Sequence, residues 1–472
     1  MIPMTLAEVA EVVGGRTHDG HGDPGRVQVT GPAFVDSRAP EPGGLFVAVQ
    51  GEHVDGHDFA VVAVEQGAAA VLASRPVDVP CVVVDDVVES LGRLASVVRD
   101  RLPDCRVVGL TGSQGKTTTK DVLAQILDRV GPTVATAGSY NNELGLPLTV
   151  LRADASTRHL VLEMGARHVG DIGYLAGLVR PDVAVVLNVG VAHLGEFGDR
   201  EGIAQTKGEL VEALDESGVA VLNADDPLVS AMASRTRGRV MTFGSSSRAD
   251  LRITSLRMDA LGRPQIGLAA AGESVDVALP LVGEHQAGNA AAAAAVALAL
   301  GVPLDDVATA LEHVSARSRW RMEVSERADG VTVVNDAYNA NPDSMRAALK
   351  TLAVIGARDR RTVAVLGEML ELGPGSRDEH DAVGRLAVRL DVSRLVVVGE
   401  GAKPIHLGAS LEGSWAGESV FVPDIDAALR FLADDIGSGD VVLVKASRGA
   451  GLERVAAALL DRPDAVREGA HG

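Results

Sequence analysis

The chain has 472 residues, a formal net charge of -20 and two cysteines. This length predicts about three domains of ordinary size. So acidic a composition argues against nucleic acid, or an anionic membrane, as the main partner. Two cysteines are too few for a disulfide framework or a thiolate metal site. No apolar run approaches membrane-spanning length and the start of the chain does not resemble a signal peptide, so we expect no membrane insertion and a cytoplasmic location.

Residues 1–102 are expected to form a small α/β N-terminal domain. The first helix should begin after Thr5, because Glu8 stands where a capping box needs it. Further strands are predicted at 45–49, 69–73 and 81–84, and further helices at 60–67 and 87–101. The polar residues that could act on a ligand are Ser37, Arg38, His57 and Asp58. From chemistry alone, a solvated loop is the simpler explanation for all four.

The strongest functional signal is RVVGLTGSQGKTTTKD, residues 106–121. A short buried strand is predicted at 107–108, a glycine-bearing loop at 109–115 and a helix from Lys116 onward. The N–H groups of such a loop, together with the positive end of the helix, can surround a phosphate. Lys116 would add a mobile positive charge, and Thr117 a hydroxyl for Mg²⁺. The stretch therefore predicts a nucleotide phosphate site.

Residues 103–314 are predicted to form a central P-loop domain with a doubly wound, mostly parallel sheet. Strands are expected near 134 and at 159–163, 183–187 and 219–222, a helix at 200–214, antiparallel strands within 250–280 and two helices within 285–312. Ligands of such sheets bind at the carboxyl ends of the strands. The polar residues just past those ends are Glu163, Asn188, His193 and Asn223. We therefore expect a ligand site there.

Residues 315–472 restart the alternation and are predicted to form a C-terminal Rossmann-like domain. Strands are expected at 331–335, 362–366, 394–398, 419–422 and 440–444. No glycine fingerprint of the dinucleotide type occurs here, so the sequence does not support NAD binding. The distinctive motifs are NDAYNANPDSM, LGEMLELG and VLVKASRGAGLE.

Lysine is scarce, since only six of the 44 basic residues are lysines. They are Lys116, Lys120, Lys207, Lys350, Lys403 and Lys445. Arginine fills the other basic positions, so a remaining lysine is expected where a guanidinium cannot serve. For Lys207, which lies on a predicted helix, a solvated surface lysine is the ordinary alternative.

Ten motifs occur in the order seen in the Mur ligases: TGSQGKTTTK, SYNNELGLPLT, EMG, NVGVAHLGEFG, IAQTKGEL, NADDP, HQAGNAAAAA, DAYNANP, LGEM and VKASR. The chain resembles this family over all three segments. The resemblance implies an ATP-dependent amide ligase of peptidoglycan assembly, with an N-terminal domain for the UDP-sugar, a central ATPase domain and a C-terminal domain for the incoming amine. Within the family, DAYNANP and LGEMLELG imply the member that joins D-alanyl-D-alanine to UDP-N-acetylmuramoyl-tripeptide, and nothing in the sequence requires more than a monomer.

The resemblance also implies a mechanism. ATP would phosphorylate the acceptor carboxylate, and the amine would displace phosphate from the acyl phosphate. The β- and γ-phosphates would be held by Lys116 and its loop, which comprises Gly112, Ser113, Gln114, Gly115, Thr117 and Thr118. Thr117 and Glu163 would ligate a first Mg²⁺, and His193 and Lys207 would serve a second. Lys207 would first react with CO₂, because a carbamate is an anionic oxygen donor whereas a bare ammonium repels Mg²⁺.

Other family positions fall on the nucleotide side of the site. By resemblance, Asn289 would contact adenine, Asp336 would lie beside the ribose, and Asn339 and Asn341 would line the same cleft. A family arginine that reaches the phosphates corresponds to Arg321. The residue before that arginine is usually glycine, whereas this chain has Trp320, so the choice between Arg319 and Arg321 stays open.

The remaining positions concern the two substrates that become joined. Ser37 and Arg38 match uridine-diphosphate contacts, and Asn141 and Asn142 match the loop that faces the muramoyl peptide. The residues expected to hold the carboxylate of D-alanyl-D-alanine are Lys445, Ser447 and Arg448. The C-terminal domain should close onto the central one about a hinge near residues 315–318.

Three alternatives stand beside this prediction. The chain could be a sibling ligase or a folylpolyglutamate synthase-like ligase, which the DAYNANP and LGEM motifs oppose. It could be a P-loop kinase or NTPase switch, in which a carbamate lysine would have no task. It could also be an inactive scaffold, which the intact set of charged and hydroxyl residues around the phosphate loop opposes.

Overall fold

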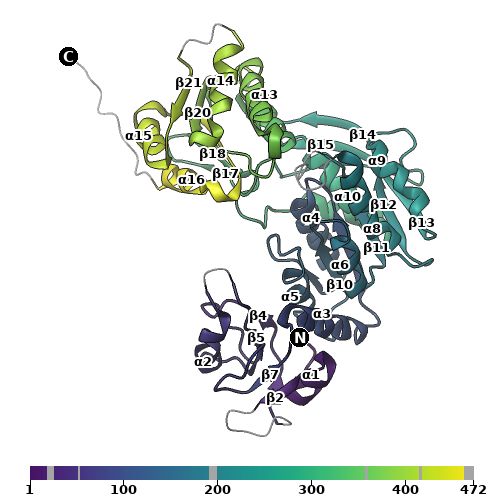
Figure 1. Ribbon diagram of the computed structural model, residues 1–472. Coiled ribbons are helices and arrows are strands. Elements are labelled where there is room, and N and C mark those ends of the chain that lie inside the picture. Colours follow the sequence, from purple (N-terminus) through teal and green to yellow (C-terminus); the bar gives the residue numbers. More distant parts are fainter. Residues whose placement is uncertain (19–25, 52–53, 191–198, 357–359, 414–416, 462–472) are drawn as a thin grey trace.

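The computed structural model describes residues 1–18, 26–51, 54–190, 199–356, 360–413 and 417–461. These residues form three lobes, with the N-terminal and C-terminal lobes at opposite ends of the central one (Figure 1). Each lobe has its own sheet with helices packed on it, which confirms the predicted three-domain α/β class. In the described ranges, no helix combines the length and the hydropathy needed to cross a bilayer.

The N-terminal lobe contains a five-stranded sheet in the order β2-β7-β6-β5-β4. Helix α1 (Leu6–Val13) begins at the predicted capping box of Thr5 and Glu8 and ends at Gly14 in the left-handed conformation. The other elements are β1 (Met4–Thr5), β2 (Arg16–His18), β3 (Gln28–Val29), β4 (Ala33–Phe34), β5 (Leu45–Val47), α2 (Ala60–Glu65), β6 (Ala70–Ala73), β7 (Cys81–Val83) and α3 (Val87–Asp100). The strands and helices predicted for this segment are confirmed, whereas the very short β1 to β4 were missed.

The central lobe contains a nine-stranded sheet in the order β16-β15-β14-β13-β12-β11-β8-β10-β9. Neighbours from β9 to β14 run parallel, and β14, β15 and β16 form an antiparallel extension. Its elements are β8 (Arg106–Thr111), α4 (Lys116–Asp128), β9 (Thr133–Ala135), α5 (Gly145–Val150), β10 (His159–Glu163), α6 (Asp171–Val179), β11 (Val183–Val186), α8 (Arg200–Glu212), β12 (Val219–Asn223), α9 (Pro227–Ser230), β13 (Arg239–Gly244), β14 (Leu251–Met258), β15 (Pro264–Ala270), β16 (Glu273–Ala278), α10 (Gln286–Ala299) and α11 (Leu304–Leu311). Helices cover both faces, as the doubly wound prediction requires.

The predicted start of the phosphate loop was wrong. The loop was predicted to begin at Gly109, but β8 continues to Thr111. Gly109 and Leu110 each pair with β10 on one side and with β11 on the other, and this pairing keeps both residues in the strand. Gly109 is a packing residue, since a Cβ there would lie 2.9 Å from Cδ1 of Leu210.

The C-terminal lobe contains a six-stranded sheet in the order β17-β18-β22-β19-β20-β21, in which only the pairing of β17 with β18 is antiparallel. Its elements are β17 (Glu323–Glu326), β18 (Thr332–Asn335), α12 (Pro342–Gly356), β19 (Thr362–Leu366), α13 (Ser376–Arg389), β20 (Arg394–Val398), α14 (Lys403–Leu411), β21 (Ser419–Val422), α15 (Ile425–Asp435), β22 (Val441–Lys445) and α16 (Glu453–Leu460). Helices α12, α13 and α14 cover one face, and α15 and α16 cover the other. The five predicted strands are confirmed, and β17 was missed.

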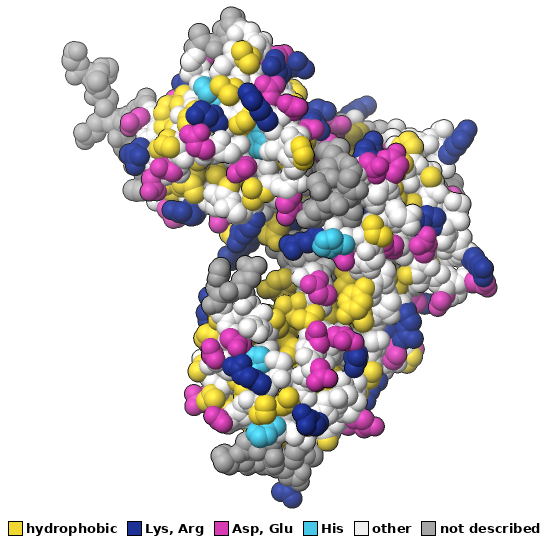
Figure 2. Space-filling view, in the orientation of Figure 1, with side chains coloured by type: hydrophobic (Ala, Val, Ile, Leu, Met, Phe, Trp, Pro, Cys, Tyr) yellow, Lys and Arg dark blue, Asp and Glu magenta, His cyan; other side chains and the backbone are white. Residues whose placement is uncertain are grey.

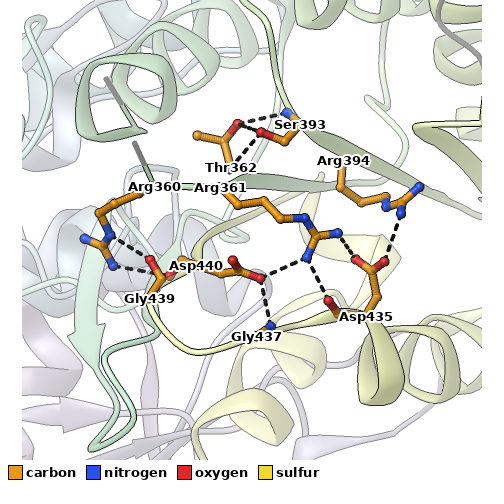
Figure 3. Close-up of polar contacts among 9 residues, drawn as sticks. All are labelled: Arg360, Arg361, Thr362, Ser393, Arg394, Asp435, Gly437, Gly439 and Asp440. Carbon is orange, nitrogen blue, oxygen red and sulfur yellow. Dashed lines mark hydrogen bonds and ion pairs between the residues drawn. The ribbon is translucent and has the colours of Figure 1, made fainter. Parts of the chain in front are cut away.

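An arginine–carboxylate network closes the amino ends of the strands in this lobe (Figure 3). Arg361 binds Asp435 and, at 3.0 Å, Asp440, while Arg394 forms a 3.0 Å ion pair with Asp435. Arg360 donates to the Gly439 carbonyl at 2.7 Å. Asp435 is the last residue of α15, and the other partners lie at the amino ends of strands or in the loops before them, so the network ties β19, β20 and β22 to α15 at the end of the sheet opposite the carboxyl ends of the strands.

The two junctions between lobes differ in kind. One hydrophobic core runs from the N-terminal lobe into the central lobe and includes Leu91 of α3, Leu146 of α5 and Leu175 of α6. The segment that leaves the central lobe is held instead by polar contacts to α4. The Gln125 side chain donates to the Ser315 carbonyl and accepts from its N–H, both at 3.0 Å. This is where the hinge was predicted.

Candidate active site

The phosphate loop lies between Gly112 and Gly115, joining β8 to α4. Gly115 has a φ of 80°, and a Cβ there would lie 2.4 Å from Oδ1 of Asn289. A Cβ on Gly112 would lie 2.9 Å from Cβ of Leu187. Both positions therefore need glycine. No side chain caps the start of α4, so the N–H groups of its first turn are left for an anion in the loop.

Asn188, just past β11, holds this loop in shape. Its side chain accepts a hydrogen bond from the Gln114 N–H at 3.0 Å and donates one to the Gln114 carbonyl at 3.1 Å. The Ser113 hydroxyl accepts from the Gly190 N–H at 2.9 Å. Asn223, the last residue of β12, donates to the Leu187 carbonyl just after β11 at 2.8 Å. These strand-end asparagines brace the loops around the site.

Lys116 folds back over the loop. Its Nζ donates to the Gly112 carbonyl at 2.8 Å. Burial lowers the pKa of Lys116, and the negative charge of Glu163 opposes that shift. The ammonium is therefore an incompletely compensated positive group next to the free N–H groups of α4.

Glu163 lies at the end of β10 and is only 1% exposed. Its carboxylate accepts hydrogen bonds from the Thr117 hydroxyl at 2.8 Å and from the Asn141 side-chain amide at 2.7 Å. Both partners are neutral, so this buried charge is only partly compensated. Among the described residues, no three His, Cys, Asp or Glu side chains gather closely enough to hold a metal. A carboxylate beside a hydroxyl fits Mg²⁺ instead, which keeps several waters and few protein ligands.

Lys207, on α8, is 8% exposed and lies on the cavity wall. Burial and the nearby positive charge of Lys116 lower the pKa of Lys207 to about 7. Among the described residues no carboxylate lies within ion-pair distance of it. His193, the proposed partner of Lys207, falls outside the described residues.

The structure distinguishes the two candidate arginines. Arg321 reaches from the C-terminal lobe to the central lobe, where its guanidinium donates to the Ser139 hydroxyl at 3.0 Å. Its Nε is buried without a hydrogen-bond partner, and its guanidinium lies 4.3 Å from the centre of the Tyr338 ring. Arg319 is exposed and does not line the cavity. Of the two arginines, Arg321 is thus the one that lines the cavity.

Lys445, at the end of β22, is buried in a polar cluster. Its Nζ donates to the Asp336 carboxylate at 2.6 Å and to the Asn339 carbonyl at 2.9 Å. Asp336 also accepts from the Met322 N–H at 3.0 Å. Lys445 therefore fixes Asp336 and the turn that carries Asn339.

Three other predicted asparagines have local partners. Asn289 donates to Gln286 at 2.8 Å and lies against the phosphate loop. Asn341 accepts from the Ser344 N–H at 2.8 Å at the start of α12. Asn142 accepts from the Gly145 N–H at 3.0 Å at the start of α5. All three line the same cavity.

Four predicted residues do not line this cavity: Ser37, Arg38, Ser447 and Arg448. Arg38 is exposed and binds Asp36 through two of its nitrogens. Ser447 accepts from the Leu370 N–H at 2.9 Å. The Arg448 guanidinium stands outside the cavity and faces Tyr338 on its wall.

The cavity itself has a volume of about 1110 Å³ and receives residues from all three lobes. Glu89 of α3 and Asn341 of the C-terminal lobe lie on its walls, along with the phosphate loop. Figure 2 shows the surface hollowed between the N-terminal and C-terminal lobes, with hydrophobic side chains next to the N-terminal lobe. Sequence reasoning missed Ser139, His285 and Gln286, which also line the cavity. The motifs SYNNELGLP and HQAGN contain these residues and were the available signal.

Family models match most of the chain. The Mur ligase middle domain matches residues 110–297, and the Mur ligase glutamate ligase domain matches residues 320–448. The model described as Mur ligase family, catalytic domain, matches residues 34–108.

Individual relatives align over nearly the whole length. A UDP-N-acetylmuramoyl-tripeptide–D-alanyl-D-alanine ligase from Mycobacterium tuberculosis is 49% identical, with 98% of each chain covered. The enzyme of that name from Escherichia coli is 36% identical, covering 97% of this chain and 99% of its own. A crystal structure of MurF from Acinetobacter baumannii has a TM-score of 0.85 at 33% identity and covers 98% and 99% of the two chains. MurF from Thermotoga maritima in complex with ADP has a TM-score of 0.77 at 33% identity, covering 90% and 96%. On these matches, the chain belongs to the Mur ligase family.

Proposed function

We propose that this protein joins D-alanyl-D-alanine to UDP-N-acetylmuramoyl-tripeptide with cleavage of ATP to ADP and phosphate. One observation carries the proposal: a single cavity brings the phosphate loop together with side chains of both flanking lobes. Its volume of about 1110 Å³ exceeds the usual range for one small ligand. Relatives that align over almost the whole chain have this activity in their names. Nucleotide-linked peptidoglycan precursors and ATP as substrates favour a cytoplasmic location.

The reaction requires two anions to meet. A carboxylate does not react with an amine in water, so its oxygen first attacks the γ-phosphorus of ATP and ADP leaves. The amine then attacks the resulting acyl phosphate, and phosphate leaves as the amide forms. Lys116 would exchange its bond to Gly112 for the β- and γ-phosphates, and Arg321 would approach them from the other lobe. Fixed cations in a dry cleft stabilise the charge that develops at these steps.

Magnesium would bind where the carboxylate of Glu163 and the hydroxyl of Thr117 already meet. Both groups offer the oxygen ligands that Mg²⁺ prefers. Because the hydrogen-bond partners of Glu163 are neutral, its carboxylate would lose no ion pair on binding the metal. Bound there, the ion would neutralise phosphate charge. His193 and Lys207 would serve a second ion.

Lys207 would carry the carbamate predicted from the family. Only an unprotonated amine attacks CO₂, and a pKa of about 7 leaves a large neutral fraction near neutral pH. The ammonium first loses one proton, and the neutral amine then forms an N–C bond with CO₂ and releases a second, so a buried cation becomes an anion with the loss of two protons. That change would also relieve the repulsion between Lys207 and Lys116.

The nucleoside would lie towards the hinge. A second cavity, of about 280 Å³, adjoins the first at Thr118, Gln286 and Arg321 and is lined by Ser315. Asn289 and Asp336 would contact the base and the ribose from either side, with Asn339 and Asn341 on the same wall. ATP bound in this way would touch the linker about which the C-terminal lobe turns.

The two joined substrates would bind on opposite sides of the phosphate loop. Asn141 and Asn142 would face the muramoyl peptide, with Ser37 and Arg38 contacting the uridine diphosphate from the N-terminal lobe. Lys445, Ser447 and Arg448 would receive the dipeptide. Because the cavity is completed within one chain, a monomer suffices.

Phosphate release from Mg-ATP tests this proposal. UDP-N-acetylmuramoyl-tripeptide is offered with D-alanyl-D-alanine, D-alanine, diaminopimelate or glutamate, and the product mass is recorded. Release only with the dipeptide, and a product heavier by that dipeptide less water, is expected. Release with another amine would indicate a sibling ligase, and release without an acceptor would indicate an NTPase.

A further inference from the structure

Two arginines and two aromatic rings alternate from the cavity wall outward: Arg321 and Tyr338 line the cavity, and Arg448 and Trp320 lie beyond them. The Arg321 guanidinium lies 4.3 Å from the centre of the Tyr338 ring. The Arg448 guanidinium lies 5.9 Å from the same ring and 4.0 Å from the centre of the Trp320 ring. Trp320 is therefore the ring in closest contact with Arg448. Stacking of this kind fixes the plane of a guanidinium while leaving its N–H groups free to bind in that plane.

The backbone at Trp320 is unusual. Its φ is 60°, a left-handed conformation that bulky residues rarely adopt, and Met322 follows with a φ of 50°. Three hydrogen bonds hold this turn: the Trp320 N–H donates to Glu323, the Tyr338 N–H donates to the Trp320 carbonyl, and the Met322 N–H donates to Asp336. Glycine would adopt this conformation without strain, so the backbone strain at Trp320 has to be offset by contacts that glycine could not make.

Arg448 has donors to spare. Its nearest carboxylate oxygen, on Glu453, is 3.9 Å away, and its side chain is half exposed. By contrast, Lys445 is already bound to Asp336 and Asn339. Of the two cationic side chains at the end of β22, Arg448 is thus the one able to accept a new anion.

The spacing suits a dipeptide. Arg321 and Arg448 face the same Tyr338 ring at 4.3 and 5.9 Å, so their guanidinium carbons are at most about 10 Å apart. An extended dipeptide spans roughly 7 Å. An amine near the phosphate served by Arg321 and a carboxylate at Arg448 are therefore compatible with one bound dipeptide.

We propose that Trp320 is a positioning residue for the incoming dipeptide: its ring holds the Arg448 guanidinium in the plane in which Arg448 binds the dipeptide carboxylate. The proposal rests on the ligase function proposed above. It explains why a bulky residue occupies a left-handed position beside Arg321.

The test compares KM values for D-alanyl-D-alanine and for its C-terminal amide, which lacks the carboxylate. Arg448→Gln should raise KM for the dipeptide roughly ten- to hundredfold and leave KM for the amide unchanged. Trp320→Gly should raise KM for the dipeptide about three- to tenfold, with KM for ATP unchanged. Trp320→Phe, which keeps an aromatic face, should recover most of the loss.

Asp391→Gly is the matched control. Asp391 also has a positive φ, 53°, but it is exposed between α13 and β20 and does not line the cavity. Replacing it by glycine relieves backbone strain without removing a ring, so every KM should stay at the wild-type value. A control that raised KM for the dipeptide as much as Trp320→Gly does would overturn the proposal.

The remaining outcomes separate this inference from the function on which it rests. An unchanged KM for the dipeptide in Trp320→Gly, or an equal penalty for dipeptide and amide in Arg448→Gln, would overturn the inference alone. Failure of the wild-type protein to consume the dipeptide would overturn the proposed function and the inference with it.

Discussion

The central lobe meets its two neighbours through different chemistry. Towards the N-terminal lobe the contact is a continuous apolar core, in which Leu91, Leu146 and Leu175 are buried together. Towards the C-terminal lobe Val282 joins the apolar cluster that contains Met322, and three hydrogen-bonded pairs cross the junction: Gln125 with Ser315, Asp121 with Ser318 at 2.5 Å, and Arg321 with Ser139. Apolar packing resists separation, whereas hydrogen bonds at an exposed junction exchange readily with water.

This difference indicates which junction can move. The N-terminal and central lobes should behave as one rigid body, while the C-terminal lobe can turn about the linker near Ser315. The cavity receives residues from all three lobes, and Arg321 brings to it, from the C-terminal side, a positive charge whose Nε has no hydrogen-bond partner. Stability should therefore depend most on the first junction, and activity on the second.

The largest expected effect is on turnover at the polar junction. Arg321→Ala should lower kcat by about 10²–10³-fold, because a fixed cation aimed at the phosphates is lost, and should change stability little. Arg319→Ala is the control, since Arg319 is an exposed neighbour. Steady-state phosphate release measures both. Equal losses in the two variants would contradict the assignment of Arg321.

The next largest effect concerns the apolar junction. Leu91 is fully buried, so Leu91→Ala should lower the free energy of unfolding by about 4 kcal/mol. Turnover of the folded protein should stay near wild type. Urea denaturation measures the change, and Leu407→Ala, on the exposed side of α14, should cost less than about 0.5 kcal/mol. Comparable losses from both variants would argue against a shared core.

The sequence predicted the parts of the site that depend on local pattern. The glycine loop, its lysine and the strand-end Glu163 were identified in this way, and the structure brings Glu163 within 2.8 Å of Thr117. Pairs formed by topology were not predictable. Lys445 and Asp336 are 109 residues apart and meet only because β18 and β22 are neighbours in the sheet.

The conformation of Trp320 was also beyond sequence reasoning. Tryptophan gives no expectation of a positive φ, and the one signal was the resemblance, which implied a glycine at this position. The motifs thus allowed the residues of the site to be predicted, whereas the contacts that these residues make between lobes were harder to predict.

The buried Lys207 on the cavity wall should make stability depend on pH. Lysine in an unfolded chain has a pKa of about 10.4, whereas the pKa of Lys207 is lowered to about 7. Between these values the unfolded state binds more protons, so stability rises with pH; below pH 7 both states are protonated and the dependence vanishes. In CO₂-free buffer, wild type should therefore gain up to about 2 kcal/mol over Lys207→Met from pH 7 to 8.5. Parallel pH profiles in urea denaturation would show that Lys207 is not responsible.

The smallest expected effect is at the hinge itself. Gln125→Leu removes all three hydrogen bonds to Ser315, but water can replace them at this exposed site, so the cost should be about 1 kcal/mol. Amide hydrogen exchange at residues 315–318 should become faster, while Gln205→Leu, an exposed change on α8, should leave it unaltered. Small-angle scattering should still show compaction with a nonhydrolysable ATP analogue and the UDP-linked substrate. Loss of compaction in a variant whose lobes stay folded would show that Gln125 guides closure as well as anchoring the linker. In that case water could not replace the hydrogen bonds of this junction, because closure would depend on their particular geometry.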